Sequence, residues 1–227
     1  MDAQWRRFFR QRAQVDETAY RACDYASRRS FQWRQGSVVD WVGVGEGRRV
    51  LDVGCGPGLF AAPWTEANEV TGIDFVREML ARARGRGLRT SQADAGALPF
   101  SSGAYDLVLC TGVLQCVDDW RGALGELVRV VRPGGTLVVG TLSDSAARRI
   151  LYRLKGAAGS RHTLRPTLFS AAELRGVLEG LGVATDVLTL YYPIRCRQVG
   201  KEDGWLPRLL GSSFAIRGRK MLEGSPR

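Results

Sequence analysis

Three glycines follow an apolar run and a carboxylate in residues 50–58, which read Val-Leu-Asp-Val-Gly-Cys-Gly-Pro-Gly. Residues 50–53 are typical of a buried parallel strand, and Asp52 lies near its end. Glycines allow a sharp turn and let a ligand approach the bare backbone. A dinucleotide fingerprint would need its third glycine one residue later, where Leu59 stands. A carboxylate within the motif would repel a pyrophosphate but attract an ammonium group, so the pattern favours a nucleoside that carries an amino acid.

Two further carboxylates follow stretches that are typical of strands. Asp74 comes directly after residues 69–73, twenty positions beyond Gly54. An acid at that place can accept hydrogen bonds from both hydroxyls of a ribose. Asp94 follows a weaker strand pattern over residues 88–92, and its carboxylate could accept a hydrogen bond from an adenine amino group. Together with the first motif, these acids indicate a nucleoside-binding edge of a parallel sheet.

With a clear fourth strand over residues 104–110, the chain resembles the class I S-adenosylmethionine-dependent methyltransferases. The closest resemblance is to their ubiquinone/menaquinone-type small-molecule branch. The resemblance is strong over residues 48–140 and weak over 168–220. Four segments carry it in order: VLDVGCGPG (50–58), VTGIDFVREML (70–80), ADAGALPFSSGAYDLVLC (93–110) and VVRPGGTLVV (130–139).

The resemblance implies how S-adenosylmethionine would be held. Asp52 and its glycines would face the methionine part of the cofactor, Asp74 would hold the ribose, and Phe75 would pack on the adenine. Asp94 and the residue after it would meet the adenine edge. The implied cofactor-binding set is Asp52, Gly54, Cys55, Gly56, Gly58, Asp74, Phe75, Asp94, Ala95, Cys110 and Thr111.

The chain departs from many relatives just after the fourth strand. Where they carry a histidine, residues 113–117 read Val-Leu-Gln-Cys-Val, so histidine chemistry is not expected there. His162, the only histidine, is the candidate general base because imidazole titrates near neutral pH. A lone histidine in a loop beside arginines is more often simply exposed. Tyr20, Tyr25 and Tyr152 are weaker candidates.

The predicted fold is α/β: a three-layer, doubly wound, mostly parallel seven-stranded sheet of the Rossmann-like methyltransferase type. Residues 1–47 are predicted to form an N-terminal helical lid over the cofactor pocket, or else plain packing helices. Residues 48–227 would form the cofactor-binding domain in one structural unit with the lid, and the insert 141–169 would shape the acceptor pocket. Ser170 and Glu173 form a capping box that predicts the start of a helix.

The C-terminal half continues the alternation of helix and strand. An amphipathic helix is predicted over residues 120–131, ending before Pro-Gly-Gly, and the fifth strand over 136–140. Residues 187–192 and 213–217 are candidates for the final antiparallel pair that the resemblance implies.

Composition agrees with a soluble enzyme of 227 residues. No apolar run approaches the roughly 20 residues of a membrane helix, and the N-terminus lacks the apolar core of a secretory signal. Five cysteines without a C-x-x-C pair suggest neither a disulfide framework nor a zinc site, and no metal is expected. A reducing cytoplasm is the expected compartment.

The formal net charge of +10 raises the question of nucleic acid. Only three of the 33 basic residues are lysines, which is typical of a GC-rich genome. Two arginine clusters, within residues 82–89 and 148–165, are read first as solvated faces and second as surfaces for an anionic partner.

These patterns predict methyl transfer to oxygen, nitrogen or carbon of a small molecule, in quinone-like or specialised metabolism. An RNA or protein methyltransferase is the first alternative. It is disfavoured because the fourth strand continues as Cys-Thr-Gly-Val-Leu-Gln, without the Asn/Asp-Pro-Pro-Tyr pattern of enzymes that methylate exocyclic amines. A protein that binds S-adenosylmethionine without transferring its methyl group is the second alternative.

Overall fold

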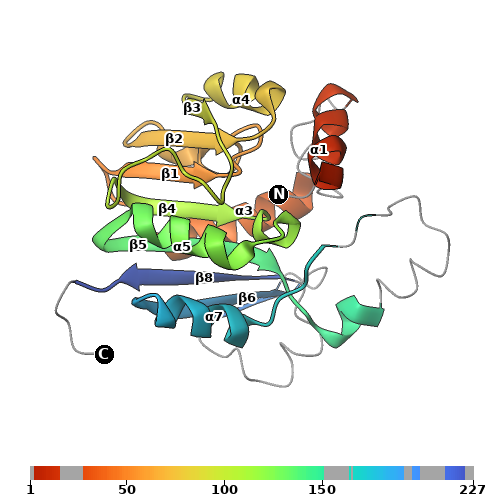
Figure 1. Ribbon diagram of the computed structural model, residues 1–227, viewed down its shortest axis with the longest axis vertical. Coiled ribbons are helices and arrows are strands. Elements are labelled where there is room, and N and C mark those ends of the chain that lie inside the picture. Colours follow the sequence, from red (N-terminus) through yellow and green to blue (C-terminus); the bar gives the residue numbers. More distant parts are fainter. Residues whose placement is uncertain are drawn as a thin grey trace.

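The computed structural model describes residues 3–15, 28–150, 164, 166–191, 196–199 and 213–222 (Figure 1). One sheet of eight strands runs through it in the order β3-β2-β1-β4-β5-β8-β6-β7. The strands are β1 Arg49–Val53, β2 Glu69–Asp74, β3 Arg89–Gln92, β4 Tyr105–Thr111, β5 Val131–Leu142, β6 Val183–Tyr191, β7 Cys196–Val199 and β8 Ser213–Lys220. The helices are α1 Ala3–Val15, α3 Arg28–Val42, α4 Arg77–Arg84, α5 Trp120–Val130 and α7 Ala171–Gly180, with 3₁₀ turns η1 Ala62–Trp64 and η2 Leu114–Cys116.

The pairing of the strands gives a doubly wound sheet. All pairs among β1 to β5 are parallel, whereas β8 runs antiparallel to both β5 and β6, and its arrow in Figure 1 points against that of β5. The predicted seven-stranded arrangement is confirmed. One further short strand, β7, pairs with β6 at the edge. The strand order reverses between β1 and β4, and ligands of such sheets bind beyond the carboxyl ends of the strands at that point.

Helices cover both faces of the sheet, because its central strands are apolar on both sides. In β1, Leu51 and Val53 belong to the cluster that packs against α5 and α7, while Val50 belongs to the cluster beneath α3 and α4. Successive side chains of a strand point to opposite faces, so a continuous apolar run fills two layers. Figure 1 shows α5 and α7 on the near side of the sheet and α3 behind it.

The fifth strand begins earlier than the sequence indicated. It starts at Val131, directly after α5, and contains the Pro-Gly-Gly that was expected to precede it. The register with β4 shifts between Tyr105 and Leu107, which is a bulge, and a proline without a backbone donor is tolerated there. A Cβ added at Gly135 would lie 2.9 Å from Arg132 O and 3.0 Å from Asp106 O, so glycine is required.

Two local predictions agree with the structure. The Ser170 side chain accepts a hydrogen bond from Glu173 N (3.2 Å) and caps α7, as the capping box predicted. The described parts of the N-terminal region, α1 and α3, are helical, and α1 packs on α4 through Ala13, Val76 and Met79. Within the described ranges, no helix is long and apolar enough to cross a membrane.

Candidate functional site

The glycine loop follows β1, which lies between β2 and β4 in the sheet. Gly54, Gly56 and Gly58 have φ values of 71°, 52° and 79°, a region that side chains rarely adopt. A Cβ at Gly54 would also lie 2.2 Å from Cγ2 of Val113, which follows β4. The loop is therefore packed closely against the β4 end, and its first glycine is needed for two independent reasons.

Asp74 fastens this loop to the end of β2. The backbone N–H groups of Gly54 and Cys55 donate to Ile73 O at 2.8 and 2.9 Å. Gly56 N donates to Oδ2 of Asp74 and Val76 N donates to Oδ1, both at 2.9 Å. Burial raises the pKa of Asp74, and its backbone donors oppose that shift. A carboxylate has about four lone-pair sites, so Asp74 keeps capacity to accept a hydroxyl from a ligand.

Asp52 is the most unusual polar group at this edge of the sheet. The residue is only 1% exposed, and its Oδ2 has no hydrogen-bond partner within the described part of the chain. Burial, and secondarily the negative charge of Asp74, raise its pKa from 3.8 to about 7. A buried carboxylate oxygen without a partner is costly, so this position is suited to a cationic ligand group.

The two predicted cysteines do not present their thiols to this opening. A Cβ added at Gly72 would lie 2.8 Å from Sγ of Cys55, which places that side chain in the core and leaves its backbone for a ligand. Cys110 is fully buried, and burial together with the charge of Asp52 raises the pKa of its thiol, so it stays protonated. Thr111 is half-buried at the end of β4.

The next residue, Gly112, was missed by the sequence analysis. It has a φ of 73°, and a Cβ added there would meet nothing within 4 Å. The space beside the end of β4 is therefore open. A glycine directly after a strand was the available signal, because glycine often marks a close approach of a ligand to the backbone.

Phe75 and Asp94 lie together under the N-terminal helix. The Phe9 ring of α1 meets the Phe75 ring edge-on at 6.3 Å, and Cζ of Arg6 lies 5.7 Å from the Phe75 centroid. Arg6 Nη2 is 2.5 Å from Asp94 Oδ2. Burial tends to raise the pKa of Asp94, but the backbone N–H of Gly96 and the Arg6 charge outweigh it, so the pKa is lowered. Sequence analysis gave no role to Arg6, since no local pattern links it to a residue 88 positions away.

Ala95, next to Asp94, is buried in the core on the α5 side of the sheet. The structure thus brings the predicted residues from the ends of β1, β2, β3 and β4 to one edge of the sheet.

The arginine cluster after the second strand is partly structural. Arg82 Nη2 donates to Ala13 O at 2.9 Å and so joins α4 to α1. Arg86 Nη1 donates to Pro57 O, in the glycine loop, and to Arg82 O, both at 3.0 Å. These two guanidinium groups hold the loop and the N-terminal helix in place.

Beyond β4 and β5, polar contacts connect the strand ends to the part of the insert that the structure describes. Thr141 Oγ1 lies 3.3 Å from Gln115 Oε1, and Gln115 O accepts a hydrogen bond from Thr167 N at 3.0 Å. Gln115 stands in the stretch where many relatives have a histidine. The candidate base His162 and the three candidate tyrosines lie outside the described residues, so their roles stay predictions.

Comparisons with known proteins agree with this geometry. A family model described as a methyltransferase domain matches residues 51–139. The malonyl-[acyl-carrier protein] O-methyltransferase of Salmonella typhimurium is 33% identical over 174 residues, which are 62% of this chain and 69% of that protein. The chain belongs to the class I S-adenosylmethionine-dependent methyltransferases.

Other members of the family match this chain over smaller or larger shares of its length. The demethylmenaquinone methyltransferase of Renibacterium salmoninarum is 39% identical over 115 residues, 49% of this chain and 48% of that protein. A crystal structure from Thermotoga maritima, a methyltransferase described as a possible histamine N-methyltransferase, has a TM-score of 0.65 at 25% identity and covers 83% and 89% of the two chains. The chain spans about half the length of several curated relatives, from 43% to 58%.

Proposed function

We propose that this chain transfers a methyl group from S-adenosylmethionine to a small-molecule acceptor. The observation that carries the proposal is the buried Oδ2 of Asp52, which has no partner in the described chain and lies at the switch point of the sheet. The ammonium group of S-adenosylmethionine is a cation of suitable size for it. A carboxylate that is costly to bury alone becomes favourable when an ammonium group pairs with it.

The remaining residues fit the other parts of the cofactor. Asp74 would accept hydrogen bonds from the ribose hydroxyls with its free lone pairs, while its backbone bonds keep it oriented. Phe75 would pack against the adenine, with Asp94 and Ala95 at the adenine edge. The turn at Gly54 and Gly56 and the open backbone at Gly112, next to Cys110 and Thr111, would allow the methionine part to approach the strand ends. Gly58 serves packing instead, because a Cβ there would lie 3.0 Å from Ala83 of α4.

When bound, S-adenosylmethionine supplies an electrophilic methyl group on a sulfonium that is also its own leaving group. The protein then mainly binds and aligns the reactants, and alignment contributes up to roughly 7–11 kcal/mol. Cys110 is buried and protonated, so it is unsuited to act as a nucleophile. His162 remains the candidate for removing a proton from a hydroxyl acceptor.

The acceptor is proposed to lie between the lid, residues 1–47, and the insert, residues 141–169. The contact of α1 with Phe75 supports the first boundary, and the contacts of Gln115 and Thr167 support the second. The names of the relatives point to acyl or quinone-like acceptors, and one of the two names specifies oxygen as the methylated atom.

A nucleic-acid substrate is less well supported, because Arg82 and Arg86 donate to backbone carbonyls of the protein itself. The proposed compartment is a reducing cytoplasm.

The test is transfer of label from methyl-labelled S-adenosylmethionine into fractions of a cell extract. We expect label in small organic molecules, and less of it with Asp52→Asn than with the matched control Glu66→Gln, whose side chain is exposed. Label in RNA or protein would favour the first alternative. Tight cofactor binding without transfer into any fraction would favour a protein that only binds the cofactor.

A further inference from the structure

A hollow lies at the opposite end of the sheet from the proposed cofactor site. It encloses about 550 Å³ between the connection that follows α3, the starts of β4, β5 and β6, and the end of β8. Arg48, on its wall, precedes β1, whereas Gly54 follows β1. Six residues of extended chain separate the two sites by about 20 Å. The hollow is therefore distinct from the edge where the cofactor is proposed to bind.

The charged side chains of the hollow are mostly arginines. They are Arg48, Arg132, Arg217 and Arg219, with Asp106 and Asp186; we call this set the arginine groove. Four positive and two negative groups leave a net charge of +2 in one concave surface. A hollow of this size is within the usual range of small-ligand sites, about 300–1,000 Å³.

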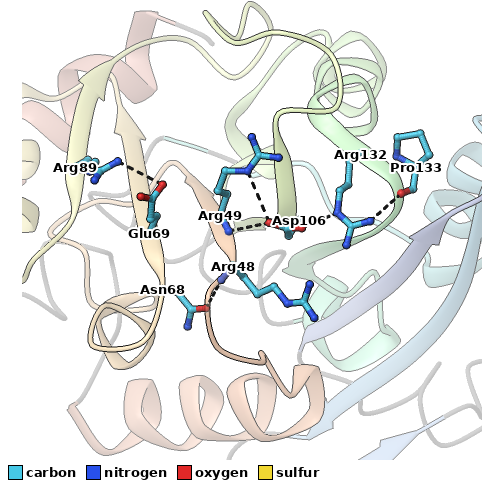
Figure 2. Close-up of polar contacts among 8 residues, drawn as sticks. All are labelled: Arg48, Arg49, Asn68, Glu69, Arg89, Asp106, Arg132 and Pro133. Carbon is cyan, nitrogen blue, oxygen red and sulfur yellow. Dashed lines mark hydrogen bonds and ion pairs between the residues drawn. The ribbon is translucent and has the colours of Figure 1, made fainter.

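Both carboxylates of the arginine groove are already paired. Arg132 Nε donates to Asp106 Oδ1 at 2.6 Å, and the backbone N–H of Arg49 donates to Asp106 Oδ2 at 2.9 Å (Figure 2). Burial tends to raise the pKa of Asp106, but these donors outweigh burial. The pKa is therefore lowered, and the carboxylate stays ionised. Arg217 Nη2 pairs with Asp186 Oδ2 at 3.2 Å. Neither acid is left to neutralise the other two arginines.

Arg48 and Arg219 keep most of their donors. Arg48 donates to Asn68 through its backbone N–H, but its guanidinium has no hydrogen bond or ion pair in the described chain. In Figure 2 the Arg48 side chain extends toward Arg132 without a dashed contact. Within the described part of the chain Arg219 makes one hydrogen bond, from Nε to Gly134 O at 3.3 Å, so its two terminal amino groups can donate to a ligand. Guanidinium groups hold phosphate through paired hydrogen bonds, so two free ones in one hollow form a suitable phosphate site.

The backbone beside these arginines is also accessible. Gly43 and Gly134 line the hollow with φ values of 60° and 71°, and a Cβ added at Gly43 would meet nothing within 4 Å. Arg217 is held separately, by a bond to Trp41 O at 2.7 Å and by its position 4.7 Å from the Trp41 ring centroid. The wall of the groove is thus fixed by internal contacts, while its glycines leave room for a ligand.

We propose that the arginine groove binds a small ligand through a phosphate or diphosphate group, independently of the methyl-transfer site. Two net positive charges match the charge of such a group near neutral pH. The ligand would contact Arg48 and Arg219 directly, whereas Arg132 and Arg217 would hold the walls through their bonds to Asp106 and Asp186. A free diphosphate and a phosphorylated metabolite share this chemistry.

The test is calorimetric titration of the whole protein with inorganic pyrophosphate, and separately with glycerol phosphate, at about 150 mM salt to suppress unspecific attraction. Arg48→Gln and Arg219→Gln should each weaken pyrophosphate binding about tenfold or more. The matched control is Arg89→Gln, which removes the same charge on β3, where Arg89 pairs with Glu69 at 3.5 Å outside the groove. The control should change the affinity less than about twofold. Tighter binding of glycerol phosphate would identify a phosphorylated metabolite as the source, and tighter binding of pyrophosphate would identify free diphosphate.

Saturation with S-adenosylmethionine should leave pyrophosphate binding unchanged, because the two sites lie at opposite strand ends. The proposal would be overturned by a dissociation constant above about 10 mM, by equal losses in the control and the groove variants, or by competition with the cofactor. It would also be overturned if a short RNA bound about tenfold more tightly than pyrophosphate through the same arginines, since the surface would then serve nucleic acid. These variants have exposed side chains, and a thermal unfolding curve without ligand checks that each one folds.

Discussion

Replacing Asp52 with asparagine should change stability and cofactor affinity in opposite directions. The pKa of the Asp52 carboxyl is about 7 in the folded protein and 3.8 in an exposed chain, because the fold buries the carboxyl beside Asp74. Because its pKa is higher in the folded protein than in the unfolded chain, protonation of Asp52 stabilises the fold. This stabilisation is complete below about pH 4 and is lost as the pH rises to about 7. The difference of roughly three pH units corresponds to about 4 kcal/mol. Asparagine has the same shape and no charge.

Urea unfolding without cofactor measures this effect. Asp52→Asn should be more stable than the wild-type protein above pH 7, by up to about 4 kcal/mol, and the difference should shrink steadily toward pH 4. The control Glu66→Gln removes an exposed charge and should change stability by less than about 0.5 kcal/mol at every pH. A variant that is less stable than wild type at pH 8 would refute the reasoning.

Cofactor binding should move the other way. Loss of a charge-assisted bond to the ammonium group costs about 1.5–3 kcal/mol, so the affinity for S-adenosylmethionine should fall roughly tenfold to a hundredfold. In the wild type, affinity should rise with pH up to about 7, because Asp52 must release its proton before it pairs with the cation. Calorimetry that shows the same pH dependence in Asp52→Asn would remove this residue from the site.

Asp74 provides a contrast within the same site. Its oxygens accept hydrogen bonds from Gly56 N and Val76 N, so Asp74→Ala leaves two backbone donors without their partner. We expect it to weaken cofactor binding by about 1–3 kcal/mol and also to destabilise the protein. Unchanged affinity in a folded variant would contradict its proposed role at the ribose.

Three further predictions concern the lid, the loop and the candidate base. Arg6→Ala should tighten cofactor binding up to about fivefold, because its partly exposed ion pair with Asp94, at the adenine edge, is worth about 0.2–1 kcal/mol. Calorimetry checks this, with the exposed Arg7→Ala as the control. Weaker binding by Arg6→Ala would instead make Arg6 a cofactor contact. Gly54→Ala should lower the free energy of unfolding by about 1–3 kcal/mol, because Gly54 has a positive φ and lies close to Val113. The control Gly125→Ala, inside a helix with open space around it, should be neutral or stabilising in the same urea experiment. His162→Ala should keep cofactor affinity and lower turnover less than about tenfold, while a hundredfold loss together with a missing inflection near pH 6–7 would identify it as the general base.

The strands that build the site could be predicted because their signals are local. The apolar runs before Asp52 and Asp74 and the glycines after the first of them define two strand ends, and parallel strands bring those ends to one edge. The start of β5 was placed too late because Pro133 and its glycines read as an interruption. In the fold the same residues form a bulge, where the missing N–H of proline costs nothing.

Other features of the site depend on contacts between distant parts of the chain. No periodicity near Arg6 indicates that it meets Asp94, since only the packing of α1 on α4 brings them together. The carboxylate of Asp52 was visible in the motif, but its unpartnered oxygen follows from the arrangement of three strands around it. The arginine groove likewise collects side chains from both ends of the sequence, and the arginine-rich composition hid them.

The two carboxylates of the site have a consequence for turnover. On the proposed function, Asp52 holds the ammonium group and Asp74 the ribose, and neither group changes when the methyl leaves. The demethylated product, S-adenosylhomocysteine, keeps both groups, so it would be held by the same contacts. Because these contacts do not change as the methyl group is transferred, they are equally strong in the ground state and the transition state, so they lower KM without raising kcat. The same acids that capture the methyl donor would therefore make the protein sensitive to accumulation of its own product, and its rate in a cell would depend on how quickly that product is removed.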